Sequence, residues 1–547
     1  MVLIIVGIIL LRLFFQPGFP ETHDGQNHIA RLANMSLAAV DRHFPFRWAP
    51  NLNYKFGYPV FNFNYYLPQI AALPLKLVGL SFESSLKLVI GLSLIAGGVF
   101  WFLLLKKWFN KLPALAGALL YMTAPYQMVN IWVRGSVGEI VAFGLLPFLL
   151  WLIVGFFEKP NLWRFTMISL GITAFMLSHN ILVLVGMPFL LTFIVVLAWQ
   201  MKSWRRLKWM GLVLGLGIGM SLFFWLPALG EKQFTNIDQI NLSYQYKDHF
   251  PSFRQLLKSD WGYGYSVPGN EDNLTFELGP FHCLAVVLAG LSLAVNKLRK
   301  QRIENKKIWG FFIGVFFLSL FFMMKFTYPI WEIIPFAHYI QFPWRLLIFS
   351  CLGSAFLGAG LTHYLPKLGL SLAVGAIIYA LVLSKPGGWF NWDNYFYYGF
   401  PFSTSVLGEN MPKWFYQERV YAVEGKILDL GGVASIKELA WKTQRHDYEI
   451  DTPIATEIWE RTAYFPGWEV YINGEKTEIN YEREDYPGVI TFSVPPGKHE
   501  IKTVLTENTP ARRLGDTLSL VSLIVFLGII FIDRLSYVKI FKEKKTS

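Results

Sequence analysis

The sequence predicts a polytopic α-helical membrane protein with about twelve transmembrane helices and a β-rich domain near its C-terminus. Of its 547 residues, 54% are hydrophobic and only 16% are charged, whereas soluble domains carry about 25% charged residues. Apolar stretches long enough to span a bilayer alternate with short connections along most of the chain. A single long stretch near the C-terminus instead has the alternating pattern of β-strands.

Twelve apolar stretches are predicted to cross the membrane. They are 2–15, 84–105, 112–125, 137–157, 162–177, 180–199, 209–228, 280–296, 308–324, 343–362, 367–384 and 514–533. The first stretch is short and contains Arg12, which is consistent with a truncated N-terminus. The start also lacks the basic region and the small-residue cleavage site of a signal peptide.

The basic residues predict the orientation of these spans. The connections predicted to be cytoplasmic contain 21 Lys or Arg; they are 106–111, 158–164, 200–208, 297–307, 363–367 and the tail from 534. The short connections on the other side (80–84, 126–136, 178–180 and 326–342) contain a single basic residue, Arg134. This asymmetry predicts a cytoplasmic N-terminus. Because the net charge of +12 is concentrated beside apolar spans, it does not indicate nucleic-acid binding.

The long outer connections divide the chain into three parts. Residues 1–384 form a transmembrane domain with outer loops 16–83 and 229–279, residues 385–513 form an extracytoplasmic β-rich domain, and residues 514–547 form the final transmembrane helix and a basic cytoplasmic tail. Within the first loop, an amphipathic helix ending near Gly79 is expected to lie along the membrane surface.

The β-rich domain is predicted to be a sandwich tethered between the last two helices. Residues 468–476 contain a strand that enters an Asn473-Gly474 type I′ turn. Val489–Val494, Pro495-Pro496-Gly497 and Glu500–Leu505 are expected to form a second hairpin.

Ionisable residues cluster directly after the first span, and such residues at a membrane face are functional candidates. If a helix begins near Asp24, then Asp24, His28 and Arg31 lie on one helical face. A carboxylate beside an imidazole suits a general base. The alternative is an N-cap aspartate with a surface ion pair to Arg31, which the spacing alone favours.

Two arginines lie at the outer side, where the charge rule disfavours them. Arg134 is expected to pair either with Glu139 or with an anionic ligand, and Arg345 enters a helix from the outer interface. Guanidinium groups suit bidentate contact with phosphate, although both side chains could instead extend toward lipid headgroups. His179, at the outer lip of two spans, is either part of the site or a hydrogen-bonded structural residue.

The sequence assigns no cofactor. Six of the ten histidines lie near the outer side, which leaves a divalent metal open, but no spacing of the HExxH kind supports a metal site. Cys283 and Cys351 fall in apolar spans, so neither a disulfide framework nor a cysteine zinc site is expected.

Several short motifs distributed over most of the chain carry a resemblance. They are His23-Asp24 with His28 and Arg31, Phe46-Arg47-Trp48, Gly57-Tyr58-Pro59-Val60-Phe61, Ala124-Pro125-Tyr126, Arg134-Gly135 with Glu139, Gln341-Phe342-Pro343-Trp344-Arg345, Tyr464-Phe465-Pro466-Gly467-Trp468 and Pro496-Gly497-Lys498-His499. With these motifs the chain resembles the GT-C superfamily of membrane glycosyltransferases. It is more closely similar to the bacterial membrane family labelled 6-pyruvoyl-tetrahydropterin synthase-related and to YfhO-like proteins. In many GT-C enzymes a second acidic residue follows the first, whereas here Gly25 follows Asp24.

The resemblance implies a GT-C-like fold and an enzyme that transfers sugar from a polyprenyl-phosphate carrier to a glycan, lipid or protein acceptor. Asp24 would be the catalytic base, and His28 and Glu139 would orient the reacting groups. Arg134 and Arg345 would stabilise the departing phosphate, with Arg31 and His179 also binding substrate. The aromatic surface helix would seat the polyprenyl tail, and the β-rich domain would bind the acceptor or cap the cavity.

The resemblance further implies a bacterial plasma-membrane protein whose active site and β-rich domain face outward. Two other functions remain open from the sequence. One is a transporter or flippase for a lipid-linked saccharide, which predicts charged groups near the bilayer midplane and internal repeats. The other is a non-catalytic envelope assembly factor whose β-rich domain recruits partners.

Overall fold

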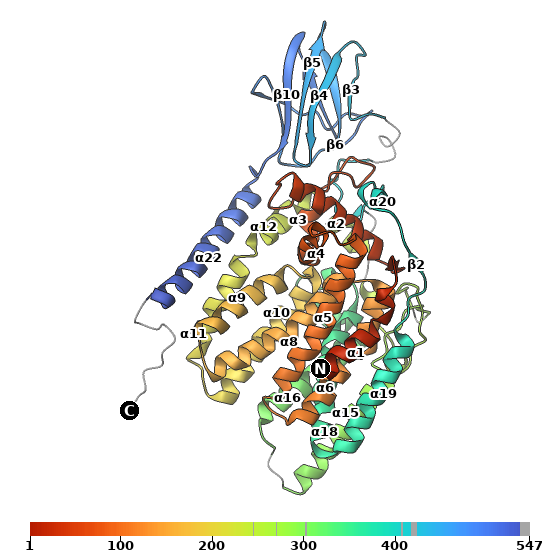
Figure 1. Ribbon diagram of the computed structural model, residues 1–547, viewed down its shortest axis with the longest axis vertical. Coiled ribbons are helices and arrows are strands. Elements are labelled where there is room, and N and C mark those ends of the chain that lie inside the picture. The colour runs from red at the N-terminus through yellow and green to blue at the C-terminus, as the bar shows by residue number, and fades with distance from the viewer. Residues whose placement is uncertain (244–245, 270, 301–302, 406–407, 417–423, 536–547) are drawn as a thin grey trace.

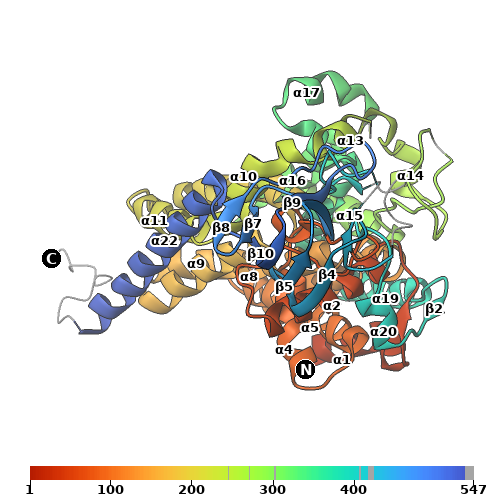
Figure 2. The ribbon, with the colours of Figure 1, turned by 90° about the horizontal axis from the view of Figure 1, so that it is seen from above.

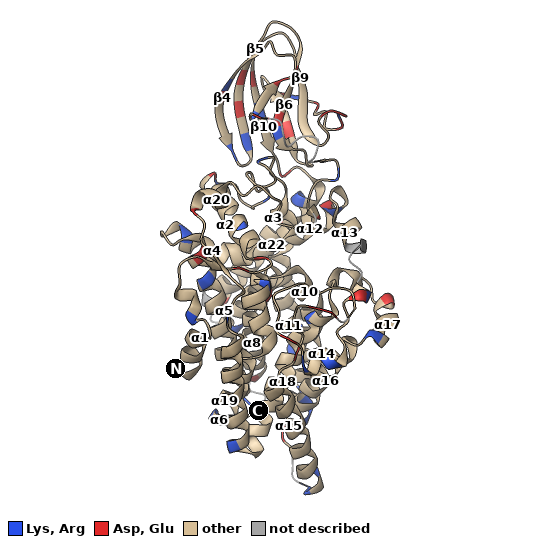
Figure 3. Cartoon of the chain, turned by 90° about the vertical axis from the view of Figure 1, so that its right-hand side faces the viewer, with Lys and Arg blue, Asp and Glu red and all other residues tan. Residues whose placement is uncertain are grey.

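A β-sandwich stands on one end of a helical bundle in the computed structural model (Figure 1). The structure describes residues 1–547 except 244–245, 270, 301–302, 406–407, 417–423 and 536–547. Most of the predicted basic tail therefore lies outside the described residues. Lys and Arg mark the lower ends of the bundle helices, opposite the sandwich (Figure 3).

Long apolar helices form the bundle. They are α1 (Val2–Leu10), α5 (Phe82–Leu105), α6 (Lys111–Met122), α8 (Val137–Glu158), α9 (Leu162–Met176), α10 (Asn180–Met201), α11 (Arg206–Gly219), α12 (Leu222–Glu231), α15 (Pro280–Leu298), α16 (Lys306–Phe322), α18 (Leu347–Tyr364), α19 (Pro366–Leu383) and α22 (Pro510–Leu535). Each of the twelve predicted spans coincides with one or more helices. The prediction of a polytopic helical membrane protein with a C-terminal β-sheet region is confirmed.

Fewer helices meet the length and composition of a membrane span than the twelve spans predicted. Among the described residues, seven helices are long and apolar enough to cross a membrane, or up to nine if each bent pair counts as one span. The bent pairs are Arg206–Gly219 with Leu222–Phe234, at 62°, and Lys306–Phe322 with Lys325–Ile333, at 87°. Helices α6 and α9 are apolar but shorter, and α1 has nine residues.

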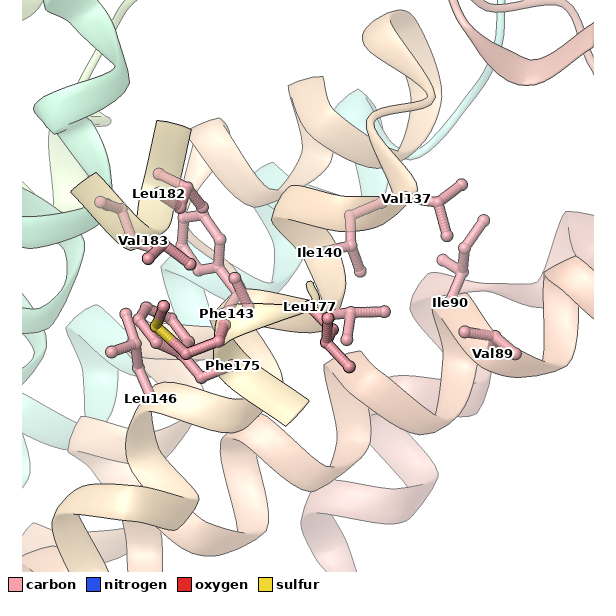
Figure 4. Close-up of a cluster of buried hydrophobic side chains, with 14 of the residues drawn as sticks. Val89, Ile90, Val137, Ile140, Phe143, Leu146, Phe175, Leu177, Leu182 and Val183 are labelled. Atoms are coloured by element: carbon pink, nitrogen blue, oxygen red, sulfur yellow. The ribbon is translucent and has the colours of Figure 1, made fainter. Parts of the chain in front are cut away.

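The bundle core is apolar and lies directly below the outer face. Helix α8 packs against α5 on one side and α9 on the other, and α18 packs against α6, α15 and α16. Figure 4 shows Ile140, Phe143 and Leu146 of α8 facing Leu182 and Val183 of α10. These residues are at most 6% exposed, so this cluster forms a tightly packed floor beneath the outer loops.

Short elements cover the outer end of the bundle. They are η1 (Arg12–Phe15), β1 (Phe19–Pro20), α2 (Gly25–Val40), α3 (Val60–Phe63), α4 (Leu67–Leu77), α7 (Pro125–Val129), η2 (Asn130–Arg134), η3 (Lys232–Phe234), α13 (Ile237–Ser243), η4 (Tyr246–Asp248), α14 (Phe253–Leu257), η5 (Lys325–Thr327), α17 (Tyr328–Ile333), η6 (Ala337–Ile340), η7 (Pro343–Leu346), β2 (Trp389–Phe390) and α20 (Asn394–Tyr398). Helix α4 corresponds to the helix predicted to end near Gly79. Strand β1 pairs antiparallel with β2, which ties the first outer loop to the segment that follows α19.

The sandwich contains two antiparallel sheets. Its strands are β3 (Ile427–Asp429), β4 (Ser435–Lys442), β5 (Arg445–Thr452), β6 (Thr456–Ala463), β7 (Trp468–Ile472), β8 (Glu475–Thr477), β9 (Val489–Val494) and β10 (Gly497–Leu505). One sheet has the order β4-β5-β10-β7-β8 and the other β3-β6-β9. The β7–β8 hairpin is confirmed, because Asn473 and Gly474 both adopt the positive φ angles that a type I′ turn requires.

The second predicted hairpin is wrong. Both strands exist, but β9 pairs with β6 in the small sheet, and β10 pairs with β5 and β7 in the large one. The short link between Val494 and Gly497 therefore crosses from one sheet to the other. Each strand can bury its apolar face whether β9 and β10 pair with each other or belong to different sheets. The alternation of apolar and polar residues therefore does not distinguish a hairpin turn from a crossover between sheets.

Ion pairs of two buried arginines lie where the sandwich meets the bundle. Arg512, at the start of α22, pairs with Glu231 of α12 at 3.0 Å and donates to the Thr506 carbonyl at 2.9 Å. Arg47 of the first outer loop pairs with Glu507 at 3.1 Å and Asp516 at 2.9 Å. Seen from above, the sandwich lies over α2 and α8, with α22 running to one side (Figure 2). These contacts hold the sandwich above the outer loops.

Candidate functional site

A cavity of about 870 Å³ lies at the outer end of the bundle, beneath the sandwich. Its polar wall contains His23, Asp24, Asn27, His28, Arg31, Asn64, Tyr65, Arg134, Ser136, His179, Asn180, Lys232, Tyr265, Ser266, Tyr339, Gln341, Arg345, Thr404, Ser405, Glu409 and Asn410. Six of the seven predicted site residues thus line one cavity, although they come from segments far apart in the sequence. The seventh, Glu139, is fully buried directly behind the wall.

Backbone hydrogen bonds place Asp24 beside Arg134. The amide nitrogens of His23 and Asp24 donate to the carbonyl oxygens of Val133 and Arg134, at 3.0 and 2.9 Å. Gly135 makes this approach possible: it has a φ of +63°, and a Cβ atom there would lie 2.2 Å from Thr22 Oγ1. The turn at Arg134 and Gly135 therefore packs directly against the start of α2.

Asp24 occupies the N-cap position of α2, as the sequence predicts, but its side chain does not cap the helix. Within the described residues it also forms no ion pair with Arg31, whose guanidinium donates to Thr404 Oγ1 at 2.9 Å. The alternative of an N-cap aspartate paired with Arg31 is therefore wrong. The carboxylate instead faces the cavity, where burial raises the pKa of Asp24 and the positive charges of Arg134 and Arg31 oppose that rise.

Glu139, in the first turn of α8, links the two outer arginines. Its Oε1 atom lies 2.7 Å from Arg134 and 3.2 Å from Arg345, and its Oε2 atom accepts from the Tyr126 hydroxyl at 2.8 Å. The predicted ion pair between Arg134 and Glu139 is thus observed. The alternative, in which both arginine side chains extend toward lipid headgroups, is not observed. A single carboxylate shared by two guanidinium groups leaves a net positive charge at the cavity wall.

The two histidines of the predicted site have other partners than Asp24. His28 is 1% exposed, and its Nδ1 atom lies 3.0 Å from the Gln69 amide nitrogen. Burial lowers its pKa well below the ordinary value, so the ring is neutral. The expected Asp24–His28 contact is therefore absent among the described residues, because the ring turns toward α4. His179 accepts from the Leu182 amide at 3.2 Å, as in the structural alternative, and it also lines the cavity.

The segment that leads from α19 to the sandwich contributes a residue that the sequence did not indicate. Glu409 lines the cavity, and burial raises its pKa to about 7 while Arg31 and Arg345 oppose the rise. The residue lies within 385–513, a stretch assigned to the β-rich domain and distant from any span. No local sequence motif identifies Glu409 as a site residue. The fold brings it into the same cavity as Asp24.

The opposite wall of the cavity is apolar. It is formed by Met176, Ile181, Val183, Leu184, Trp225, Ala228, Leu229, Ile237, Ile240, Phe336, Phe342 and Trp344. Leu229 of α12 and Phe336 before η6 are 58% and 61% exposed, so this wall continues onto the outer surface of the bundle. None of the residues that line the cavity comes from α4, the helix expected to seat a lipid tail.

The polar wall offers unused hydrogen-bonding atoms. Asn64 Oδ1 and Asn180 Oδ1 are buried and have no hydrogen-bond partner within the described part of the chain. Such atoms in native proteins ordinarily have a partner, so they are suited to accept from a bound ligand. Across the same described residues, no group of three or more His, Cys, Asp or Glu is arranged to hold a metal ion.

Comparison with known proteins gives one family and several distant structural similarities, two of which are described below. A family model described as "6-pyruvoyl-tetrahydropterin synthase related domain; membrane protein" matches residues 61–393. No curated protein matches the sequence. The structure is similar to the arabinofuranosyltransferase AftD from Mycobacteria, with a TM-score of 0.42 and 15% identity over 78% of this chain and 29% of that one. It is also similar to the Archaeoglobus fulgidus oligosaccharyltransferase, with a TM-score of 0.37 and 13% identity over 72% of this chain and 54% of that one. The chain thus spans less than two thirds of either protein.

Proposed function

The chain belongs to the 6-pyruvoyl-tetrahydropterin synthase related family of membrane proteins, and we propose that it is a glycosyltransferase that takes sugar from a lipid-phosphate carrier. One observation carries the proposal. A single cavity joins a carboxylate, a positively charged wall and an apolar wall that reaches the outer surface of the bundle.

Each wall suits one part of such a donor. Arg134 and Arg345 share one counter-ion, Glu139, so their remaining positive charge matches a phosphodiester. The apolar wall on α10 and α12 suits an isoprenoid tail, which would enter sideways from the membrane. The amides of Asn27, Asn64 and Asn180 suit sugar hydroxyl groups.

The transfer step follows from this arrangement. Asp24 accepts the proton of the acceptor hydroxyl as its oxygen attacks the anomeric carbon. The bond between that carbon and the phosphate oxygen breaks, and its electron pair leaves with the lipid phosphate. The guanidinium groups of Arg134 and Arg345 stabilise the negative charge that develops there.

The position of the charges favours this reaction over transport. Glu139 lies in the first turn of α8, Arg345 lies in η7 directly before α18, and His179 precedes α10. These three groups thus lie at the ends of the bundle helices, whereas a transporter is expected to hold charged groups near the bilayer midplane. The outer face of a bacterial plasma membrane is the location that we propose for them.

Transfer in reconstituted liposomes tests the proposal. Purified protein receives radiolabelled polyprenyl-phosphate sugars or, as a control, the matching nucleotide sugars, with cell-envelope extract as acceptor. We expect label to enter a product from the lipid donors only. If lipid-linked sugar crosses the bilayer without transfer, the protein is a transporter and the proposal is wrong.

A further inference from the structure

We propose that Glu409 is a second catalytic carboxyl group of this cavity, which gives a proton to the departing lipid phosphate while Asp24 accepts the proton of the acceptor. The inference rests on the proposed function and adds a residue to it. It also assigns a chemical role to the segment that connects the bundle with the sandwich.

Described residues on both sides of Glu409 make contacts with the bundle. On one side, Thr404 is 1% exposed, accepts from Arg31 Nε at 2.9 Å, and lies 2.8 Å from the Tyr58 hydroxyl. On the other side, the amide nitrogen of Lys413 donates to the Phe234 carbonyl at 3.0 Å. Glu409 is therefore held at the cavity wall by contacts with α2 and η3.

The surroundings of Glu409 distinguish it from the other acidic residues near the cavity. Glu139 is paired with two arginines and Asp238 with Lys232 at 2.9 Å. The carboxyl group of Glu409, by contrast, forms no hydrogen bond or ion pair with the described residues, although it lines the cavity. Its charge interacts with those of Arg31 and Arg345, which favour ionisation, and with that of Asp24, which opposes it.

The remaining titratable side chains of the cavity are poorer proton donors at neutral pH. They are His23, His28, His179, Tyr65, Tyr265, Tyr339, Arg31, Arg134, Arg345 and Lys232. Burial lowers the pKa values of His23 and His28, so both rings are neutral. Arg134, Arg345 and Lys232 are held by acidic partners, and Arg31 donates to Thr404. Burial raises the pKa of Glu409 to about 7, close to the second pKa of a phosphate monoester, which is about 6. A proton can therefore move between the two groups with little cost.

The step balances without any further reactant. The bond between the acceptor oxygen and the anomeric carbon forms, and the acceptor proton moves to Asp24. The bond between the anomeric carbon and the phosphate oxygen breaks, and the phosphate receives the proton of Glu409. Transfer of a proton from Asp24 to Glu409, directly or through water, then restores the starting state, so the products are the glycosylated acceptor and a singly protonated lipid phosphate.

The pH dependence of transfer by Glu409→Gln tests the role. Glutamine keeps the shape and the hydrogen-bonding capacity of the side chain but has no proton to give. We expect turnover at neutral pH to fall about 10²-fold. We also expect the decline in activity that wild type shows above about pH 7 to disappear.

A donor whose phosphate leaving group is less basic should restore most of the rate that Glu409→Gln loses, whereas it should not restore the rate of Asp24→Asn. Glu424→Gln, an exposed residue of the same connecting segment, is the matched control.

A second measurement does not depend on activity. Infrared difference spectra of the wild type between pH 6 and pH 8 should contain the C=O band of a protonated carboxylic acid, and Glu409→Gln should lose it. An active Glu409→Gln enzyme with the wild-type pH profile overturns the assignment and leaves the proposed function intact. A uniform loss of rate with every donor and an unchanged profile would make Glu409 a structural residue. A wild type without transfer would overturn both proposals.

Discussion

The amide nitrogen of Asp24 donates a hydrogen bond of 2.9 Å to the carbonyl oxygen of Arg134. This bond joins the start of α2 to the turn before α8, two segments more than 100 residues apart. Through it, the proposed base and the proposed phosphate ligand keep a fixed separation. Most of the proposed chemistry depends on this junction.

Gly135→Ala is expected to disturb the junction and lower transfer about 10²-fold, because small displacements of reacting groups have effects of this size. The φ of Gly135 is +63°, and a Cβ atom there would meet Thr22 Oγ1 at 2.2 Å. Gly432→Ala is the control, since it has a φ of +70° and open space around its Cβ position. Initial transfer rates of both variants would be compared. Equal rates of the two variants would contradict the role of the close contact with Thr22 at this junction.

Glu139→Gln is expected to lower the free energy of unfolding by about 3 kcal/mol, because it leaves two buried guanidinium groups without their counter-ion. Glu158→Gln removes an exposed partner of Lys107 from the same helix and is expected to cost less than about 1 kcal/mol. Thermal unfolding in detergent measures both. Similar shifts in the melting temperature would contradict the role of Glu139 as a shared counter-ion.

Ala228→Phe is expected to narrow the apolar wall and raise the KM for long polyprenyl donors about tenfold, equivalent to about 1.4 kcal/mol. Donors with a short tail should keep their KM, because they do not reach this wall. Leu226→Phe lies on the same helix outside the cavity lining and serves as the control. An increase in KM independent of tail length would place the tail elsewhere.

The sandwich contains a buried carboxylate that predicts a loss of stability in acid. Glu460 lies 2.7 Å from His446 Nδ1 and accepts from the Thr503 hydroxyl at 2.6 Å. Burial opposes its charge, but His446 and the hydrogen bonds outweigh burial and hold the pKa of Glu460 below its ordinary value. Its stabilising contribution is thus complete above the ordinary glutamate pKa of about 4.3 and decreases as the pH falls through the lower folded-state pKa.

Hydrogen exchange of sandwich peptides in the intact protein measures this effect. Protection in β5, β6 and β10 should fall below about pH 4 in the wild type. Glu460→Gln should reduce protection at neutral pH and remove that pH dependence. Glu449→Gln changes an exposed partner of Lys437 and should leave both unchanged. A Glu460→Gln profile that matches the wild type would contradict the account.

The sequence predicted those features that depend on local pattern. Hydropathy located the helices, and Asn473-Gly474 identified a turn, because a type I′ turn needs positive φ at both positions. The pairing of Arg134 with Glu139 was also predictable, since the two lie on neighbouring turns near a membrane face. Features that depend on long-range packing were not predictable. The partner of His28 is Gln69 in another helix, and β9 and β10 belong to different sheets. Glu409 reaches the cavity from the segment between α19 and the sandwich.

Transfer by Asp24→Asn, in liposomes that contain a polyprenyl-phosphate sugar and an envelope acceptor, tests the central claim most directly. The variant keeps the backbone hydrogen bond to Arg134 and loses only the base. Asp260→Asn, an exposed change on the same outer side, is the control. We predict that the wild type and Asp260→Asn transfer label and that Asp24→Asn does so at least about 10²-fold more slowly. Transfer by Asp24→Asn at the wild-type rate would contradict the assignment of Asp24 as the base.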